Sequence, residues 1–585
     1  MPDANTFSGQ PVAGKAPVTL PFKPFQLDAV EDDYDLIILG GGLAGMGLAL
    51  QVKRSRPETT ILVVEKQNFP RPEAAFKVGE STQEMAAHYL SNVLGLKEHL
   101  NECQLLKFGV RFFLSQGDNS DITHRIEAGR TYFSPFKSYQ LDRGRLENIM
   151  ALECRKLGIK LLENTKARRV ELSQAGHQVE LEGPDGTSSA TARWIVDASG
   201  RSSVLKRQLG LQQESGHNVN ATWFRIKKDI DINTWSDALQ WRSRQGSQNR
   251  RFSTNHIMGK GYWVWFIPLA SGSTSIGIVS DARLHPFSEL NRFDRALNWL
   301  KEHEPQVARV VEECQEDLQD FRVLKNFSYG ATKVFSVDRW CLTGEAGVFL
   351  DPLYSPGSDY IAVSNTLIAD LVQRDLAGEP INGRVNWYDQ MFLSLFESSL
   401  LGYKDQYELF GNAQVMMAKL IWDGAIYWGF PALLYCQNRW TDLNFMRSVM
   451  SDIRRCSNLQ TLMQQFFHDW HEYGGDERDW GDLFVKYQDI DFLKNMIHDL
   501  ARDFSDPAQL KSHFHQNVDL LEDLADAIIT RAVELHPELA SRVKLTRTAS
   551  GEKLDSPAFQ PEKNDLREAL DEIWFDKRVE PAGIL

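Results

Sequence analysis

The sequence predicts an α/β fold that opens with a βαβ unit, continues into an antiparallel β-sheet and ends in an α-helical region. The first observation is a strand-length apolar run at 34–39, followed by glycines at 40–45, a helical segment at 46–54 and a second strand at 60–66. The second is the alternating, aromatic-rich pattern of 105–145 and of the β-rich stretch 218–280. The third is the helical apolar spacing that dominates after about residue 390.

The same signals divide the chain of 585 residues into four segments. We expect a flexible N-terminal arm at 1–30, a folded core at 31–385, a helical region at 386–545 and a polar tail at 546–585. Further strands of the core are expected at 160–181, 193–198 and 340–343, and helices at 146–157, 286–318 and 359–376.

Composition excludes several classes of protein. Lys and Arg number 65 against 79 Asp and Glu, and the net charge of −14 argues against a nucleic-acid partner. The longest early apolar stretch, 36–52, contains five glycines and is short for a membrane span, so no transmembrane segment is expected. The chain has six cysteines, too few for a disulfide scaffold, which favours a reducing cytoplasmic location. They form no C-x-x-C pair, which argues against a zinc site.

A glycine fingerprint follows the first predicted strand. Gly40, Gly42 and Gly45 fit G-x-G-x-x-G: the first permits a tight turn, the second lets a pyrophosphate approach, and the third lets helix and strand pack. Ala44 belongs to the same cofactor-facing turn, and Glu65 ends the second strand, where a carboxylate accepts the ribose hydroxyl hydrogens. The alternative is a glycine-rich junction without a ligand. A single fingerprint at the start of the fold favours FAD, with a separate flavin reductase as partner.

Three further segments resemble those of p-hydroxybenzoate-hydroxylase-type flavoproteins. They are Tyr139–Arg143 with Leu146 and Glu147, Asp197–Arg201, and Gly344–Ala346. The resemblance implies that Arg143, Gly344 and Glu345 bind FAD, and that the backbone of Val170 contacts the adenine. Glu345 departs from the aspartate of that pattern by one methylene group.

Two more motifs give a narrower resemblance. Residues 263–268 form W-x-W-x-I-P and residues 77–81 form K-V-G-E-S. With the fingerprint, they resemble the flavin-dependent halogenases of the tryptophan halogenase superfamily over residues 33–375. The resemblance implies a halogenase-like catalytic core in which FADH2 and O2 give a flavin hydroperoxide that a halide attacks to form hypohalous acid. Glu80 of the second motif is expected beside the cofactor.

The same resemblance assigns roles to three side chains. Trp263 and Trp265 would separate flavin from substrate, and Lys77 would hold the oxidised halogen as a haloamine or through its ammonium group. Indole-type members carry their lysine near 106–108, which makes Lys107 the second candidate. Alternatively, Lys77 is a surface cation or a partner of the flavin phosphates, and the two tryptophans belong to the ordinary core of a β-sheet.

The segment Asp351–Gly357 resembles the halide-binding loop of that family. Backbone N–H groups at a helix start cradle an anion there, and Gly357 and Ser358 could donate. Pro356 has no N–H, so one donor is lost. Tyr354 stands where indole-specific members place a glutamate, which favours an electron-rich phenol or pyrrole, free or bound to a carrier protein.

The leading hypothesis is therefore a two-component, FAD-dependent halogenase with a halide as co-substrate. The runner-up is an FAD-dependent monooxygenase or dehydrogenase on the same scaffold, favoured by Pro356. A third reading is a non-catalytic FAD-binding protein that uses its helical region for docking. His468 and His471 lie three residues apart and fit a solvated helix better than a metal site, so no metal is predicted. The aromatic stretch 422–440 fits core, a substrate lid or a membrane-surface contact.

Overall fold

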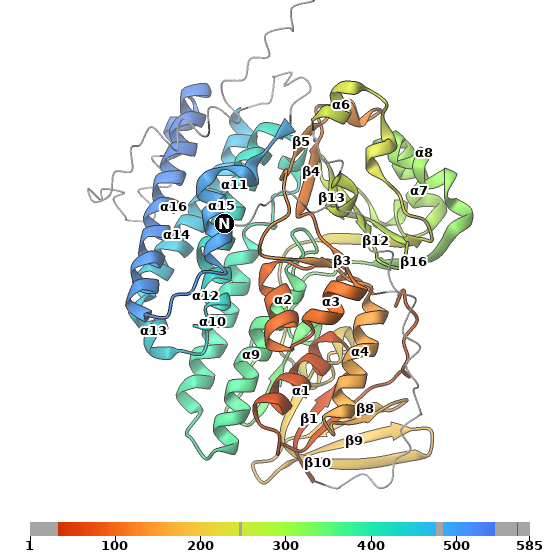
Figure 1. The fold of residues 1–585 in the computed structure, drawn as a ribbon, viewed down its shortest axis with the longest axis vertical. Helices are drawn as coiled ribbons and strands as arrows, with labels where there is room; N and C mark the ends of the chain where they lie inside the picture. Colours follow the sequence, from red (N-terminus) through yellow and green to blue (C-terminus); the bar gives the residue numbers. More distant parts are fainter. Residues whose placement is uncertain (1–32, 76, 245–248, 475–483, 544–569, 571–585) are drawn as a thin grey trace, which may run out of the picture.

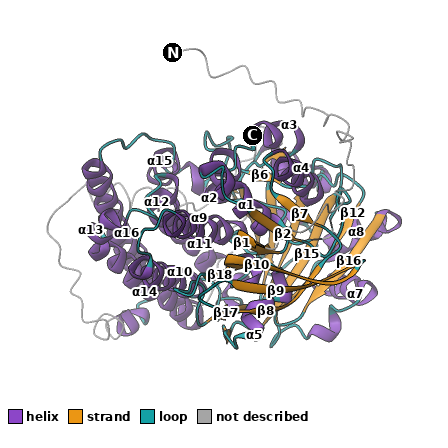
Figure 2. Ribbon diagram, turned by 90° about the horizontal axis from the view of Figure 1, so that it is seen from below, coloured by secondary structure: helices purple, strands orange, loops and turns teal. Residues whose placement is uncertain are grey.

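The computed structural model describes residues 33–75, 77–244, 249–474, 484–543 and 570. Figure 1 shows three parts: a first sheet with α1–α4, a second sheet above it, and a layer of long helices along one side. Figure 2 shows the same division from below, with the C-terminal helices on one side and the two sheets, with the helices that pack on them, on the other. The predicted arm at 1–30, and the predicted tail at 546–585 apart from Leu570, lie outside the described residues.

The first sheet carries the predicted βαβ unit. Its order is β7-β2-β1-β10-β9-β8, with β18 also paired to β10. The β1 strand pairs in parallel with β2 and β10, whereas β10, β9 and β8 form an antiparallel extension. Helices α1 and α4 contact one another, and α9 packs on α1. The bounds are β1 Asp33–Leu39, α1 Leu43–Ser55, β2 Ile61–Val64, α4 Arg143–Lys156, β7 Lys160–Leu162, β8 Lys166–Glu171, β9 His177–Gly183, β10 Gly186–Asp197, β18 Trp340–Leu342 and α9 Gly357–Leu376.

The second sheet is the predicted antiparallel sheet, with two parallel pairs that the sequence did not indicate. Its order is β16-β12-β15-β14-β13-β4-β5-β19, and the pairs β13–β4 and β5–β19 are parallel. The single helix predicted at 286–318 is two helices, because Pro305 starts a new one. The bounds are β4 Val110–Leu114, β5 Ile126–Ala128, β12 Val219–Ile226, α6 Leu239–Ser243, β13 Thr254–Gly259, β14 Tyr262–Pro268, β15 Thr274–Asp281, α7 Phe293–His303, α8 Pro305–Glu313, β16 Leu318–Leu324 and β19 Phe484–Val485.

The C-terminal region is helical, as its apolar spacing predicts, and it shares one hydrophobic core with the first sheet. Trp422, Trp428 and Trp440 of the aromatic stretch are buried in that core. The bounds are α10 Asn382–Leu400, α11 Ala413–Tyr427, α12 Leu433–Cys436, α13 Leu443–Ser448, α14 Met450–Gly474, α15 Asp491–Asp499 and α16 Pro507–Leu535. The remaining short elements are α2 Glu84–His88, α3 Lys97–Cys103, β3 Leu105–Leu106, β6 Tyr139–Gln140, α5 Val204–Gln208, β11 Gln212–Glu214 and β17 Tyr329–Ala331.

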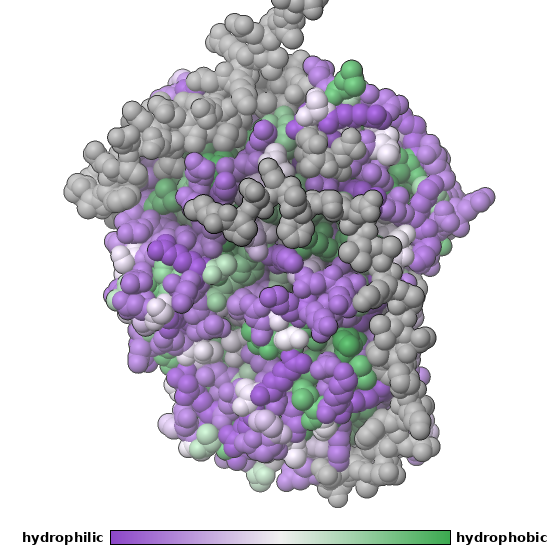
Figure 3. Space-filling view, viewed as in Figure 1, coloured by the Kyte–Doolittle hydropathy of each residue, from purple (hydrophilic) through white to green (hydrophobic). Residues whose placement is uncertain are grey.

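The described surface in Figure 3 is mainly hydrophilic, with apolar residues in small separate groups. Within the described residues, every helix is too short or too polar to cross a bilayer. All six cysteines are free thiols, and five of them are buried.

Candidate functional site

The glycine fingerprint forms a tight turn between β1 and α1. Gly40 has a φ of +118°, and a Cβ there would overlap the carbonyl oxygen of Ala198. A Cβ on Gly45 would overlap the carbonyl oxygen of Gly40. Gly42 differs, because a Cβ there would meet only the Lys77 amine, at 3.9 Å. Two of the three glycines are therefore required by the fold, and the third borders open space of the kind that a pyrophosphate needs.

Glu65 lies at the end of β2, beside this turn. Its Oε2 accepts a hydrogen bond from the Gly41 N–H at 2.8 Å, and its Oε1 accepts one from the Gln67 N–H. Arg71 forms an ion pair with the same carboxylate. The carboxylate is thus held at the place that its spacing from the fingerprint predicts. Ala44 lies in the first turn of α1, and a Cβ on Gly344 would approach it to 3.0 Å.

A cluster of cations surrounds the open side of the glycine turn. Lys77 Nζ lies 2.6 Å from one oxygen of the buried Glu147 carboxylate, and Arg143 donates to the other oxygen at 2.9 Å. Arg143 also donates to the carbonyl of Val78. Its Nε, like Nη1 of Arg201, is buried without a hydrogen-bond partner. Buried donors without partners are costly, so these groups fit the phosphates and polar chain of an FAD molecule.

The smaller of two cavities begins at this cluster and ends at the second sheet. It is lined by Arg143, Glu345, Trp263, Trp265, Gly357 and Ser358, among other residues. Burial raises the pKa of Glu345, and Arg201 and Arg143 oppose that shift. Glu80 also lines this cavity, but its Oε1 accepts a hydrogen bond from Arg225 at 2.7 Å. Glu80 therefore ties the K-V-G-E-S segment to β12.

The backbone of Val170 is engaged by a side chain of its own chain. The Gln208 carboxamide accepts from the Val170 N–H at 3.1 Å and donates to the Val170 carbonyl at 2.6 Å. An adenine would have to displace Gln208 to use these groups. The predicted adenine contact of Val170 therefore stays a prediction.

The two tryptophans of W-x-W-x-I-P lie on the same face of β14, as residues two apart in a strand must. Their ring centroids are 5.6 Å apart and both side chains are buried. Trp265 covers Gly277 on β15, where a Cβ would overlap its indole ring. Trp263 donates to the Tyr407 hydroxyl at 3.0 Å, and Tyr407 donates to Asp351 at 2.7 Å. The indoles are thus held rigidly, and Trp263 is linked to the loop that precedes α9.

That loop turns sharply before α9. Tyr354 and Ser355 have φ values of +65° and +61°, a conformation that costs about 1–3 kcal/mol for a residue other than glycine. Pro356 is the residue before the first helical turn, which begins at Gly357. The first N–H groups of a helix have no partner within the helix, and Gly357 and Ser358, which supply two of them, both line the smaller cavity.

The larger cavity has a volume of about 510 Å³ and lies between α9 and the C-terminal helices. Pro356 and Tyr360 line both cavities, so the two meet at the start of α9. Lys107 lies beside the larger one: its Nζ donates to the Thr82 carbonyl at 2.8 Å and lies 3.5 Å from the Oε1 of Gln83, a lining residue. Lys107 is 3% exposed, and burial lowers its pKa to about 7.

Comparison with known proteins shows which enzymes this chain is similar to. A flavin-dependent halogenase of Dictyostelium discoideum is 26% identical over 426 residues, which cover 67% of this chain and 69% of that protein. A 1H-pyrrole-2-carbonyl-[peptidyl-carrier protein] chlorinase of Pseudomonas fluorescens is 23% identical over 474 residues, which cover 76% of this chain and 97% of that protein. The chain is a homologue of the flavin-dependent halogenases.

Two further comparisons concern the fold of this halogenase homologue. The structure of halogenase PltM superposes with a TM-score of 0.59 at 18% identity, covering 84% of this chain and 96% of that one, which shows a shared fold. The sequence model of the lycopene cyclase protein family matches residues 35–252. That match covers less than half of the chain and ends before the W-x-W-x-I-P strand. The predicted fold class, the enzyme class and the FAD cofactor are confirmed by these comparisons.

The geometry separates the two candidate lysines. Lys77 lies next to Gly42 and is absent from the described lining of both cavities. This position favours the alternative of a flavin-phosphate partner. Lys107 is also absent from both linings, but it is 3% exposed and its Nζ lies 3.5 Å from Gln83, which lines the larger cavity. The sequence favours Lys77 because it lies in the K-V-G-E-S motif, and makes Lys107 the second candidate because indole-type members carry their lysine near 106–108.

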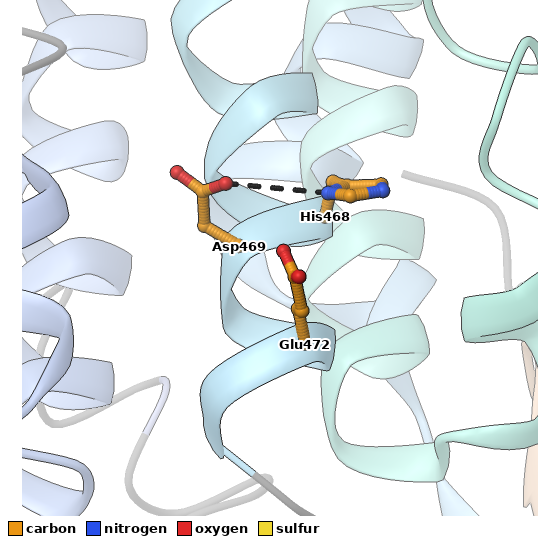
Figure 4. Close-up of side chains that lie close together, drawn as sticks. All are labelled: His468, Asp469 and Glu472. Atoms are coloured by element: carbon orange, nitrogen blue, oxygen red, sulfur yellow. Dashed lines mark ion pairs between the residues drawn. The ribbon is translucent and has the colours of Figure 1, made fainter.

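The helix α14 carries a small group of polar side chains, drawn in Figure 4. Donor atoms of His468, Asp469 and Glu472 lie within 4.8 Å of one another, with His468 Nδ1 4.0 Å from Asp469. All three belong to one helix, Glu472 is exposed, and His471 is not part of the group. A surface ion pair accounts for this arrangement, so it does not support a metal centre.

Proposed function

We propose that this protein is a FADH2- and O2-dependent halogenase that acts on an electron-rich aromatic compound, a phenol or a pyrrole. FAD, when bound and reduced, would supply hypohalous acid together with O2 and a halide ion. The chain itself would bind the cofactor at the glycine turn, with Arg143, Lys77 and Arg201 facing its charged and polar groups.

The observation that carries this proposal is the placement of a buried amine outside the flavin cavity. Trp263 and Trp265 line only the smaller cavity, and Gln83, beside Lys107, lines only the larger one. A substrate in the larger cavity would therefore be kept from the flavin, whereas a small oxidant could pass at Pro356 and Tyr360. This separation disfavours the monooxygenase alternative, which requires the arene beside the flavin.

Lys107 would hold the halogen in the larger cavity. Because burial lowers its pKa to about 7, Lys107 exists near neutral pH as both amine and ammonium. The amine can form a haloamine, and the ammonium can donate a hydrogen bond to hypohalous acid. Both forms place the halogen next to Gln83 and the cavity wall.

The larger cavity suits an aromatic ring that carries an extension. Its inner wall includes Tyr354, Tyr427 and Trp428, and its volume falls in the range of drug-sized ligands. Arg454 of α14 is exposed at the same cavity and makes no ion pair with the described residues. An anionic extension, such as the phosphate of a carrier-protein tether, would match this cation.

Replacing Arg454 with alanine should therefore change substrate selection and leave the chemistry intact. We expect the KM for a phenol bearing a phosphate or carboxylate tail to rise about tenfold, because one charge-assisted hydrogen bond is lost. The KM for an uncharged phenol should not change. Steady-state kinetics with the two substrates distinguishes this result, and an equal effect on both would remove Arg454 from tail recognition.

Restoring the missing N–H at position 356 should improve use of the halide. In Pro356→Ser, one more backbone donor becomes available before α9, and the half-saturating bromide concentration is expected to fall roughly tenfold. Bromide titration at saturating reduced flavin measures it. An unchanged titration curve would show that the anion binds elsewhere than at Gly357 and Ser358.

One incubation tests the function itself. The protein is combined with a separate flavin reductase, NADH, FAD, O2 and bromide, and with a panel of phenols, pyrroles and indoles. Mass spectrometry should show the paired bromine isotopes in phenol or pyrrole products. Hydroxylated products without bromine would support the monooxygenase instead. Carrier-bound substrates would enter the panel as phosphopantetheinyl thioesters.

The protein is expected to work in a reducing cytoplasm, which the free cysteines support.

A further inference from the structure

Two carboxylates line the larger cavity, and they differ in how fully their charge is compensated. Asp423 pairs with Lys419 at 2.9 Å, and it also accepts hydrogen bonds from Tyr354 and Gln464. Asp359, in the first turn of α9, accepts only from the Ala86 N–H and the Tyr427 hydroxyl, both at 2.8 Å. Asp423 is thus neutralised by a buried ammonium group, whereas Asp359 has no ion pair with a described residue.

Asp359 also lies near the amine that would hold the halogen. It is 3% exposed, and its partner Ala86 belongs to α2, which follows the Thr82–Gln83 segment that Lys107 contacts. Lys107 and Asp359 are close enough for each to influence the charge of the other. Glu84 is buried nearby, but it accepts a hydrogen bond from Trp428 and does not line the cavity.

From this juxtaposition we propose that Asp359 is the catalytic base that removes the proton from the halogenated ring. The inference rests on the proposed function and names a further catalytic residue for it. Position 354, in the loop before α9, carries a tyrosine, and Asp359 is the carboxylate that the first turn of α9 brings to the same cavity.

The reaction balances with these two side chains. As the ring carbon attacks the halogen, the C–X bond forms and the X–O bond of hypohalous acid breaks. The departing hydroxide takes a proton from the Lys107 ammonium and leaves as water. The ring carbon then holds both hydrogen and halogen and the ring is cationic. Asp359 takes that hydrogen as a proton, and the C–H electron pair restores aromaticity.

The same pair can reset itself after each turnover. Burial raises the pKa of Asp359 to about 7, where the hydrogen bond from Tyr427 opposes the shift, and burial lowers that of Lys107 to about 7. Burial thus brings the two pKa values closer together, which makes return of the proton from Asp359 to Lys107 easier than it would be between the free side chains. Tyr427, Glu84 and Lys107 face Asp359 from α11, α2 and the segment before β4. Further titratable groups that interact with its charge are Tyr360, Tyr403, Tyr435 and Cys436.

The test is a competition between hydrogen and deuterium. The phenol of the panel that the wild type brominates fastest is offered as an equimolar mixture of its protiated and ring-deuterated forms. At pH 8 the wild type should consume both equally, because proton loss follows halogen transfer quickly. Asp359→Asn should lose about 100-fold in rate and should prefer the protiated form, because slow proton loss lets the halogen return to Lys107. Glu84→Gln is the matched control and should show no preference.

The outcomes separate the two proposals. Equal use of both isotopic forms by Asp359→Asn would overturn the role of Asp359. If that variant fails to bind FAD, Asp359→Ser decides, because it also removes the carboxylate. A preference for the protiated form is expected, and equal use by Asp359→Ser would overturn the proposal. Absence of any brominated product from the wild type would reject the halogenase function itself.

Discussion

A Lys107→Met variant is expected to lose halogenated product by about 100-fold or more while it still binds FAD and still releases hydrogen peroxide. Methionine fills a similar volume in the buried site but offers neither a nucleophilic nitrogen nor an N–H donor. The oxidant would still form in the flavin cavity, yet nothing would hold it beside the substrate. Mass spectrometry of the product and a peroxide assay on the same samples measure both parts of this result.

The variant should fold, which keeps its loss of activity interpretable. The pKa of Lys107 is lowered from 10.5 in water to about 7, so between these values the unfolded chain binds the proton that the folded protein lacks. The wild type should therefore gain stability as the pH rises from 7 to 10, and below pH 7 the buried ammonium costs its full penalty. Methionine removes this dependence, and thermal melting at pH 7 and pH 9 reports it.

Lys77→Met is the matched control for the assignment of the lysine. Because Lys77 pairs with Glu147 beside Gly42, its loss should weaken FAD binding and leave the ratio of halogenated product to peroxide unchanged at saturating FAD. If Lys77→Met abolishes product and Lys107→Met does not, the roles of the two lysines are the reverse of those proposed.

The second large effect is expected from Gly42→Val, which should abolish FAD binding in a chain that still folds. A Cβ at this position meets only the flexible Lys77 amine, so the apoprotein has room for it, whereas a pyrophosphate would occupy the same space. We expect the dissociation constant for FAD to rise about 100-fold or more, equivalent to roughly 3 kcal/mol. Flavin fluorescence titration measures it, and circular dichroism checks the fold.

Gly45→Ala provides the contrast on the same turn. Its Cβ would overlap the Gly40 carbonyl, so this smaller change should lower the free energy of unfolding by roughly 1–3 kcal/mol. Normal FAD binding by Gly42→Val would show that the pyrophosphate does not pass this turn. The pair of variants thus separates a glycine needed for packing from a glycine needed for the ligand.

Local patterns predicted the nucleotide-binding half of the site well. The strand–glycine–helix–strand order fixes where Gly40, Gly45 and Glu65 lie, because each belongs to an element whose neighbours in sequence are its neighbours in space. The placement of Trp263 and Trp265 on one face follows equally from the two-residue period of a strand.

The substrate side could not be predicted in the same way. Lys107 and Asp359 are 252 residues apart, and they come near one another where α2, which follows the segment that Lys107 contacts, packs against α9. The sequence therefore favours Lys77, which lies in a recognisable motif, over Lys107, which follows a two-residue strand, as the halogen-carrying amine. No local signal distinguishes an aspartate that begins a helix as a cap from one that faces a cavity.

The two-residue strand β19 has a consequence for how the enzyme is built. Phe484 and Val485, from the region after α14, complete the edge of the second sheet beside β5, and Gln488 just beyond them accepts from the buried Arg130. The wall of the larger cavity also includes Tyr487 and Gln488. The larger cavity is therefore complete only where the chain returns to the second sheet at β19, whereas the described lining of the smaller cavity ends at Ile361. A chain truncated before β19 would keep the proposed flavin cavity but leave the proposed substrate cavity open.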